Sequence, residues 1–108
     1  MNPRRVHDLV RKHFPPIDFV AHEWANVADN TGPRLADITA LLDRCIAAPE
    51  LVVELNRKEG GYFSKADALT FICTNIGKGH IRISDREFTS FVVIASNGVA
   101  TGWKPTSA

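Results

Sequence analysis

The apolar residues recur at helical spacing in three segments with well-marked ends. The first runs from Asn2 to the residue before Pro15, and Val6, Leu9 and Val10 form its apolar stripe. The second begins at Pro33 and has the clearest stripe, made of Leu35, Ile38, Leu41, Leu42, Cys45 and Ile46. The third follows Ser64, which with Asp67 suits a helix start, and Gly77 suits its end. The pattern predicts a helix in each segment.

Two other segments carry weaker helical patterns. After Pro15-Pro16, one stripe contains Ile17, Val20, Ala21, Trp24 and Val27. Pro49-Glu50 then resembles the start of a short helix that carries Leu51, Val52 and Leu55. The pair Val52-Val53 weakens this prediction, because β-branched residues lose rotamer freedom in a helix.

Residues 83–98 fit two structures. A helix is indicated by Ser84 and Glu87 as a capping box, by an Ile83–Phe88 staple and by Gly98 as a left-handed end. A strand is indicated by the run Val92-Val93-Ile94, by the turn Asn97-Gly98 and by alternation over residues 80–83. Each cap contributes about 1 kcal/mol, whereas propensity differs by about half a kcal/mol per residue. A helix over residues 85–97 is therefore favoured.

These segments together predict a single domain over residues 1–108. Its expected fold class is all-α, with five or six short helices packed around one core. The alternative is an α+β fold with a C-terminal β-meander at residues 80–104.

Composition is typical of a folded domain and suggests a location. The chain has 108 residues, of which 44% are hydrophobic and 23% charged. Cys45 and Cys73 form no CxxC pair, which argues against a disulfide framework and suits a reducing cytoplasm. No apolar run approaches the roughly 20 residues that a membrane-spanning helix needs, and the first residues lack the apolar stretch of a secretory signal. A cytoplasmic protein is expected.

Motifs that would carry chemistry are incomplete. His22-Glu23 begins an HExxH zinc motif, but Asn26 stands at the second histidine position. Lys78, between Gly77 and Gly79, lacks the spacing of a phosphate-binding loop. Both cysteines lie on apolar stripes, as core residues do. The sequence predicts no catalytic residue, cofactor or metal site and a protein that is not an enzyme; a hydrolase or metal enzyme built on dispersed histidines is the third alternative.

Charge is unevenly distributed. Residues 1–17 carry four basic residues against Asp8 alone, and residues 18–55 carry seven acids against Arg34 and Arg44. Segregated charge, together with aromatic residues outside the stripes, predicts a small protein-interaction module. It would be an adaptor, inhibitor or immunity-type protein that docks on another protein, or a homodimer. The expected contacts are Phe19, Phe63 and Trp103.

The second functional hypothesis is a nucleic-acid or phosphate-binding domain. Basic side chains on one side of the N-terminal helix can follow a phosphate backbone, and two more basic residues lie near the third helix. The candidate residues are Arg4, Arg5, Arg11, Lys12, Lys78 and Arg82.

Overall fold

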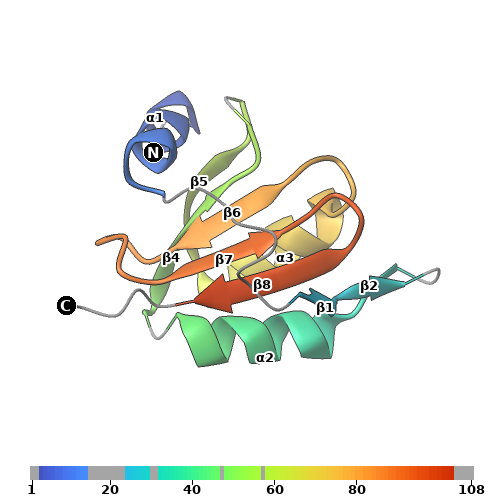
Figure 1. Cartoon of the computed structure of the whole chain (residues 1–108). Helices are drawn as coiled ribbons and strands as arrows, with labels where there is room; N and C mark the ends of the chain where they lie inside the picture. Colours follow the sequence, from blue (N-terminus) through green and yellow to red (C-terminus); the bar gives the residue numbers. More distant parts are fainter. Residues whose placement is uncertain (1–2, 15–23, 30–31, 47, 57, 104–108) are drawn as a thin grey trace.

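Figure 1 presents the fold as a computed structural model, which describes residues 3–14, 24–29, 32–46, 48–56 and 58–103. Along this part of the chain, each helix is followed by two or three consecutive strands. In order they are α1 (Pro3–His13), β1 (Ala25–Asn26), β2 (Ala28–Asp29), β3 (Gly32–Pro33), α2 (Leu35–Cys45), β4 (Glu50–Glu54), β5 (Gly60–Ser64), α3 (Lys65–Asn75), β6 (Ile81–Ser84), β7 (Phe91–Ile94) and β8 (Val99–Trp103).

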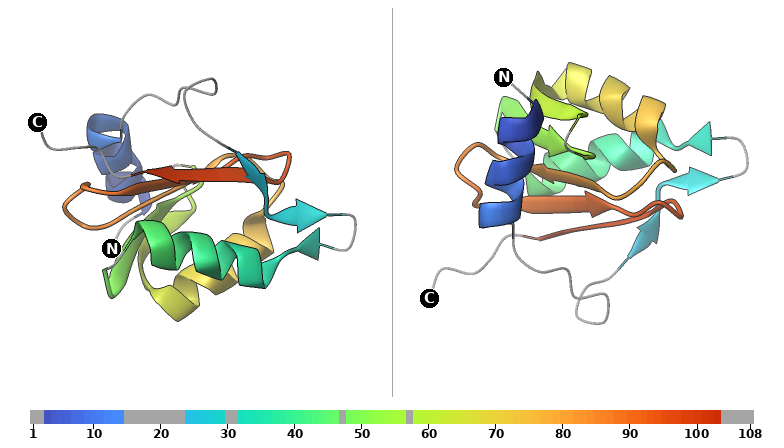
Figure 2. Two further views of the ribbon diagram at one scale, coloured as in Figure 1. Left: turned by 60° about the horizontal axis from the view of Figure 1, so that its bottom comes forward. Right: turned by 90° about the horizontal axis from the view of Figure 1, so that it is seen from above.

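One antiparallel sheet organises the molecule. Its six strands lie in the order β1-β8-β7-β6-β4-β5, while β2 and β3 form a separate two-residue ladder. Helices α2 and α3 cover one face of the sheet, and α1 lies on the opposite face near β4 and β5, as Figures 1 and 2 show. The fold is therefore α+β, in three layers where α1 is present.

The all-α prediction, and with it the description of the protein as helical, is wrong. Residues 91–94 form β7, which pairs with β6 and β8, instead of lying in a helix over residues 85–97. Strands β6, β7 and β8 follow one another as a meander, which was the alternative structure for residues 80–104. Gly98 has a φ of 88° and donates from its amide to the Ala95 carbonyl at 3.0 Å, so it closes a hairpin and does not end a helix.

The helix predicted after Pro49 is also wrong, because Glu50–Glu54 is the strand β4. Its side chains alternate between the two faces of the sheet: Leu51 and Val53 pack with the main core, and Val52 packs under α1. Of the helix predicted after Pro15, residues 15–23 lie outside the described part of the chain. Near its end, which was expected at Val27, residues Ala25–Asn26 form the strand β1.

The three helices with strong stripes are confirmed as α1, α2 and α3. The Ser64 hydroxyl accepts a hydrogen bond from the Asp67 amide at 3.2 Å, so the predicted cap of α3 is present. Gly77 follows α3 with a φ of 93°, the left-handed conformation expected of a helix stop.

Two separate apolar clusters hold the layers together. The larger lies between the sheet and helices α2 and α3, and it includes Ile38, Leu42, Ile72 and Ile83. The smaller, which we call the outer cluster, lies under α1 and consists of Val6, Val10 and Val52 with Phe14, Tyr62 and Phe88 packed against them.

Strand β8 approaches α2 so closely that only glycine fits at position 102. A Cβ on Gly102 would lie 2.5 Å from the Cys45 Sγ and 3.0 Å from a Val92 methyl carbon. We expect Gly102→Ala to lower the free energy of unfolding by about 1 to 3 kcal/mol, because the strand and helix must move apart. Denaturant unfolding measures the loss. Adding Cys45→Ala removes the nearest atom and should restore part of the stability; an equal loss in the double variant would contradict this explanation.

Candidate binding surface on α1

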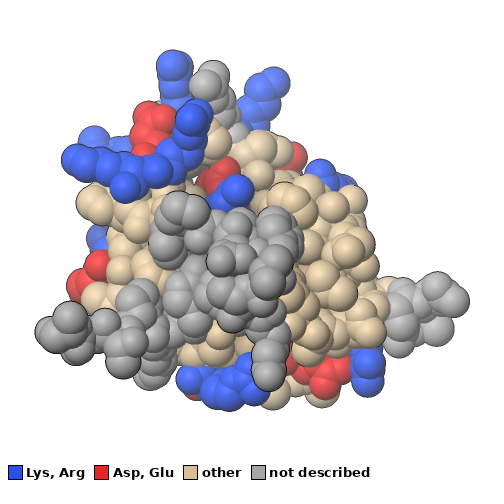
Figure 3. Space-filling model, in the orientation of Figure 1, with Lys and Arg blue, Asp and Glu red and all other residues tan. Residues whose placement is uncertain are grey.

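Helix α1 turns its apolar side to the sheet and its basic side outward. Val6 and Val10 are buried in the outer cluster, and this fixes the rotation of the helix. Figure 3 shows lysine and arginine gathered over α1, at the upper left of the view. The exposed basic side chains of the helix are Arg4, Arg5, Arg11 and Lys12. We call these four the basic face of α1.

Of the two other predicted basic residues, the structure brings one to this region. Arg82 lies on β6 directly opposite Glu54 of β4, with its Nη1 3.6 Å from the Glu54 Oε2. Lys78 belongs to the turn after α3, and Figures 1 and 2 show that this turn lies at the end of α3 away from α1. Its Nζ donates to the Asn75 Oδ1 at 3.4 Å, and it does not contribute to the basic face.

A buried carboxylate lies under α1. Glu54 is 2% exposed, and its Oε1 accepts a hydrogen bond from the His7 Nδ1 at 2.7 Å. Within the described residues no group donates a hydrogen bond to its Oε2, where the Arg82 guanidinium is the charged neighbour. The pair ties α1 to the sheet, because a carboxylate out of water requires compensating partners. Sequence reasoning missed it, and the only signal was an acid within the apolar run Leu51–Leu55.

The turn between β6 and β7 supports the C-terminal end of α1. Phe88, at a φ of 57°, packs against the outer cluster and stacks on His13 with ring centroids 5.1 Å apart. The buried Asp85 carboxylate holds this turn. It accepts hydrogen bonds from the Thr89 amide at 2.7 Å, the Ser90 amide at 3.1 Å, the Ser84 hydroxyl at 3.2 Å and the Thr89 hydroxyl. The turn therefore owes its shape to one side chain.

The pKa of Asp85 reflects two opposing effects. Burial raises the pKa, but the hydrogen bonds from Thr89, Ser90 and Ser84 outweigh burial and leave the pKa below its ordinary value. The carboxylate is thus held in its charged form.

Of the three predicted aromatic contacts, the structure describes the side chain of Phe63 alone. Phe63 is half-buried and packs on Phe71 with ring centroids 5.2 Å apart. Phe19 lies outside the described residues. Trp103 is part of β8, and its side chain is likewise not described. Leu35, 54% exposed, is the large apolar side chain that the described surface leaves open.

The histidines and cysteines of the described residues are dispersed. His7 bonds Glu54, His13 stacks on Phe88, and the His80 Nδ1 accepts from the Ser96 amide at 3.3 Å. No three His, Cys, Asp or Glu side chains among these residues are placed to hold a metal ion. Cys45 is buried, and burial raises the pKa of the Cys73 thiol, which disfavours its reactive thiolate form. His22 and Glu23 lie outside the described chain.

Comparison with protein-family models, with curated proteins and with solved structures gives no match for this chain. The functional proposal therefore rests on the basic face of α1 and on the buried residues that hold this helix against the sheet. Among the described residues, no helix combines the length and the apolar character needed to cross a membrane.

Proposed function

We propose that the protein is a non-enzymatic interaction module that docks through the basic face of α1 on an acidic surface of another protein. The observation that supports this is that one side of α1 packs against the sheet while the opposite side exposes basic residues. Val6 and Val10 pack against the sheet, and the basic residues on the other side of the helix are therefore exposed. These are Arg4, Arg5, Arg11 and Lys12. An adaptor, inhibitor or immunity-type protein would act in this way.

The overall charge favours a protein over a nucleic acid as the partner. The chain has a net charge of +1 and an isoelectric point near 7.9, whereas nucleic-acid-binding domains typically have an isoelectric point above about 9. A membrane surface is disfavoured because a helix lying in a bilayer interface inserts its apolar side, and that side of α1 is already buried.

Charge attraction of this kind affects the rate of association more than the affinity. Opposite potentials steer two proteins together, and salt weakens the effect over a Debye length of about 8 Å at physiological ionic strength. The interaction should therefore be fast to form and sensitive to salt.

The experiment combines capture and charge reversal. A partner captured from the native host at low and moderate salt is purified and its association rate measured. We expect Arg5→Glu with Arg11→Glu to lower this rate at least about tenfold at low salt. The matched control, Lys65→Glu with Lys78→Glu, changes charge equally on the other side of the sheet and should bind nearly as wild type.

Three outcomes would contradict the proposal. Equal association rates for the two double variants would show that the basic face of α1 does not contribute to binding. Retention of DNA or RNA, with log affinity falling by about 0.9 per phosphate against log salt, would indicate the nucleic-acid function instead. A dimer mass in light scattering, lost in the Arg5→Glu and Arg11→Glu variant, would identify the partner as a second copy of the chain.

We also propose a cytoplasmic location. Cys45 and Cys73 are both unpaired thiols, which suits a reducing compartment.

A further inference from the structure

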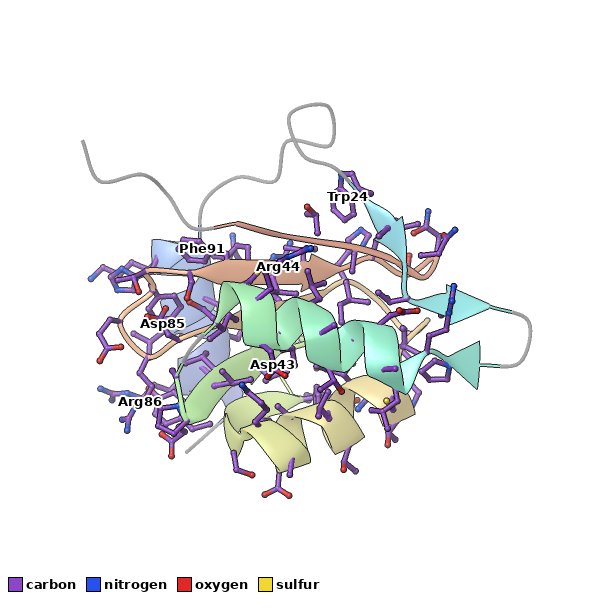
Figure 4. The ribbon with its side chains drawn as sticks, turned by 90° about the horizontal axis from the view of Figure 1, so that it is seen from below. Trp24, Asp43, Arg44, Asp85, Arg86 and Phe91 are labelled. Carbon is purple, nitrogen blue, oxygen red and sulfur yellow. The ribbon has the colours of Figure 1, made fainter. Side chains whose placement is uncertain are left out.

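A groove runs between α2 and the β1–β8 edge of the sheet, in a different part of the molecule from the basic face of α1. Its volume is about 450 Å³, within the range of small-molecule sites. Val27, Leu41 and Ala100, all buried, provide apolar lining. In Figure 4, Trp24 lies beside β1 and Arg44 projects from α2 at the side facing the sheet.

The N-cap and the body of α2 place charged groups along the groove. Arg34, Asp37 and Arg44 line it, together with Asn26 and Thr101 from the strands. These positions are three and seven residues apart on the helix, so their side chains share one face. The groove thus combines a small apolar surface with polar groups that converge on it.

The two arginines differ in their electrostatic state. The Arg34 Nε lies 2.8 Å from an Asp37 carboxylate oxygen, so that guanidinium is already paired. Arg44 is exposed, and no described group forms an ion pair or hydrogen bond with its guanidinium. A planar guanidinium with unused donors at the side of a groove matches an oxyanion in bidentate geometry.

We propose that this groove binds a small ligand carrying an oxyanion on a short apolar or aromatic body. Arg44 contacts the oxyanion, and the apolar lining beside Trp24 takes the body. Carboxylate and phosphate groups share the chemistry that Arg44 recognises, and the experiment distinguishes them. This site is independent of the proposed docking through α1.

The test is a titration of the full-length ¹⁵N-labelled protein followed by amide chemical shifts. The probes are benzoate, phenyl phosphate and inorganic phosphate, with benzamide as a neutral analogue. We expect saturable shifts at the groove residues with one or both aromatic anions, at a dissociation constant of about 1 mM or tighter. Inorganic phosphate lacks the aromatic ring and benzamide lacks the negative charge, so both should bind more weakly.

Variants then test the residues. Arg44→Gln should weaken binding about tenfold or more, because a charge-assisted bidentate contact is lost. Asp37→Asn should strengthen binding about threefold, because it removes a negative charge from the groove and releases Arg34 from its ion pair. Arg11→Gln, on α1, should leave the dissociation constant unchanged, and well-dispersed amide spectra confirm that each variant is folded.

The proposal is overturned if benzoate and phenyl phosphate cause no saturable shifts at the groove. It is also overturned if Arg44→Gln binds as tightly as the wild type, or if Asp37→Asn and Arg11→Gln behave alike. None of these results bears on docking through α1, which the charge-reversal experiment tests separately.

Discussion

His7→Ala is expected to lower the free energy of unfolding by about 2 to 3 kcal/mol, because it leaves a buried carboxylate oxygen without its hydrogen-bond donor. The His7 Nδ1 donates the hydrogen bond to the Glu54 Oε1, and the Glu54 carboxylate is 2% exposed. Without the imidazole, Arg82 at 3.6 Å is the remaining charged neighbour of a carboxylate that is still out of water. Urea or guanidinium unfolding at neutral pH measures the loss.

The other described histidine of α1 provides the control. His13 is exposed and stacks on Phe88, so His13→Ala should cost about 1 kcal/mol or less. Replacing both members of the buried pair, as in His7→Leu with Glu54→Leu, should restore much of the stability that His7→Ala loses, because no buried charge is left. Similar losses for the two single histidine variants would refute the importance of the buried pair.

Asp85→Ala is expected to lower the free energy of unfolding by about 2 to 3 kcal/mol. Substitution leaves the buried Ser90 amide and the Thr89 amide without the acceptor that shapes the turn. The turn also holds Phe88 at a positive φ against the outer cluster, so α1 should lose support as well. Glu87→Ala, an exposed change in the same turn, is the matched control and should cost less than about 0.5 kcal/mol.

The same carboxylate should make stability depend on pH. The pKa of Asp85 is lower in the folded protein than its ordinary value, so the unfolded chain binds the proton more readily. The stability that Asp85 contributes is complete above the ordinary carboxyl pKa, and it is lost as the pH falls through the folded pKa. The difference in unfolding free energy between wild type and Asp85→Asn should therefore shrink below about pH 4. If the difference in unfolding free energy between the two proteins does not change with pH, the charged Asp85 carboxylate does not stabilise the turn as proposed.

The sequence predicted helices well where one face is apolar and the ends are marked. Helices α1 and α2 show a single stripe because only one side of each is covered, and α3 carries a side-chain cap at Ser64. Local chemistry was sufficient in these segments, since neither the stripe nor the cap depends on distant residues.

Strands β4 and β7 were mistaken for helices because both of their faces are buried. Val52 lies under α1 while Val53 faces the main core, so the alternation of a half-exposed strand is absent. At β7 the error came from Ser84 and Glu87, which match a capping box. In the structure the Ser84 hydroxyl donates to the Ser90 carbonyl at 2.8 Å, and Asp85 organises the turn. Asp85 accepts from the Thr89 and Ser90 amides, beyond the Glu87 amide that a capping box headed by Ser84 would use.

The candidate sites were predictable to different degrees. The basic face of α1 follows from local spacing, because Val6 and Val10 fix which side of the helix is turned outward. The His7–Glu54 pair could not be inferred, since 47 positions separate the two residues and the sheet brings them together. The groove could not be predicted from the sequence either. Arg34 and Arg44 lie in the segment of residues 18–55, whose net charge is negative, so the charge pattern did not single them out.

The sheet separates the two apolar clusters, and this determines how substitutions combine. Val52 and Val53 are adjacent in the chain, yet their side chains belong to different clusters. Free-energy changes from mutations in the two clusters should be additive to within about 0.5 kcal/mol, so either could be redesigned without retuning the other. Sequence distance should thus be a poor guide to thermodynamic coupling here: we expect weak coupling between the two valines on β4, and strong coupling between His7 and Glu54, which lie 47 positions apart.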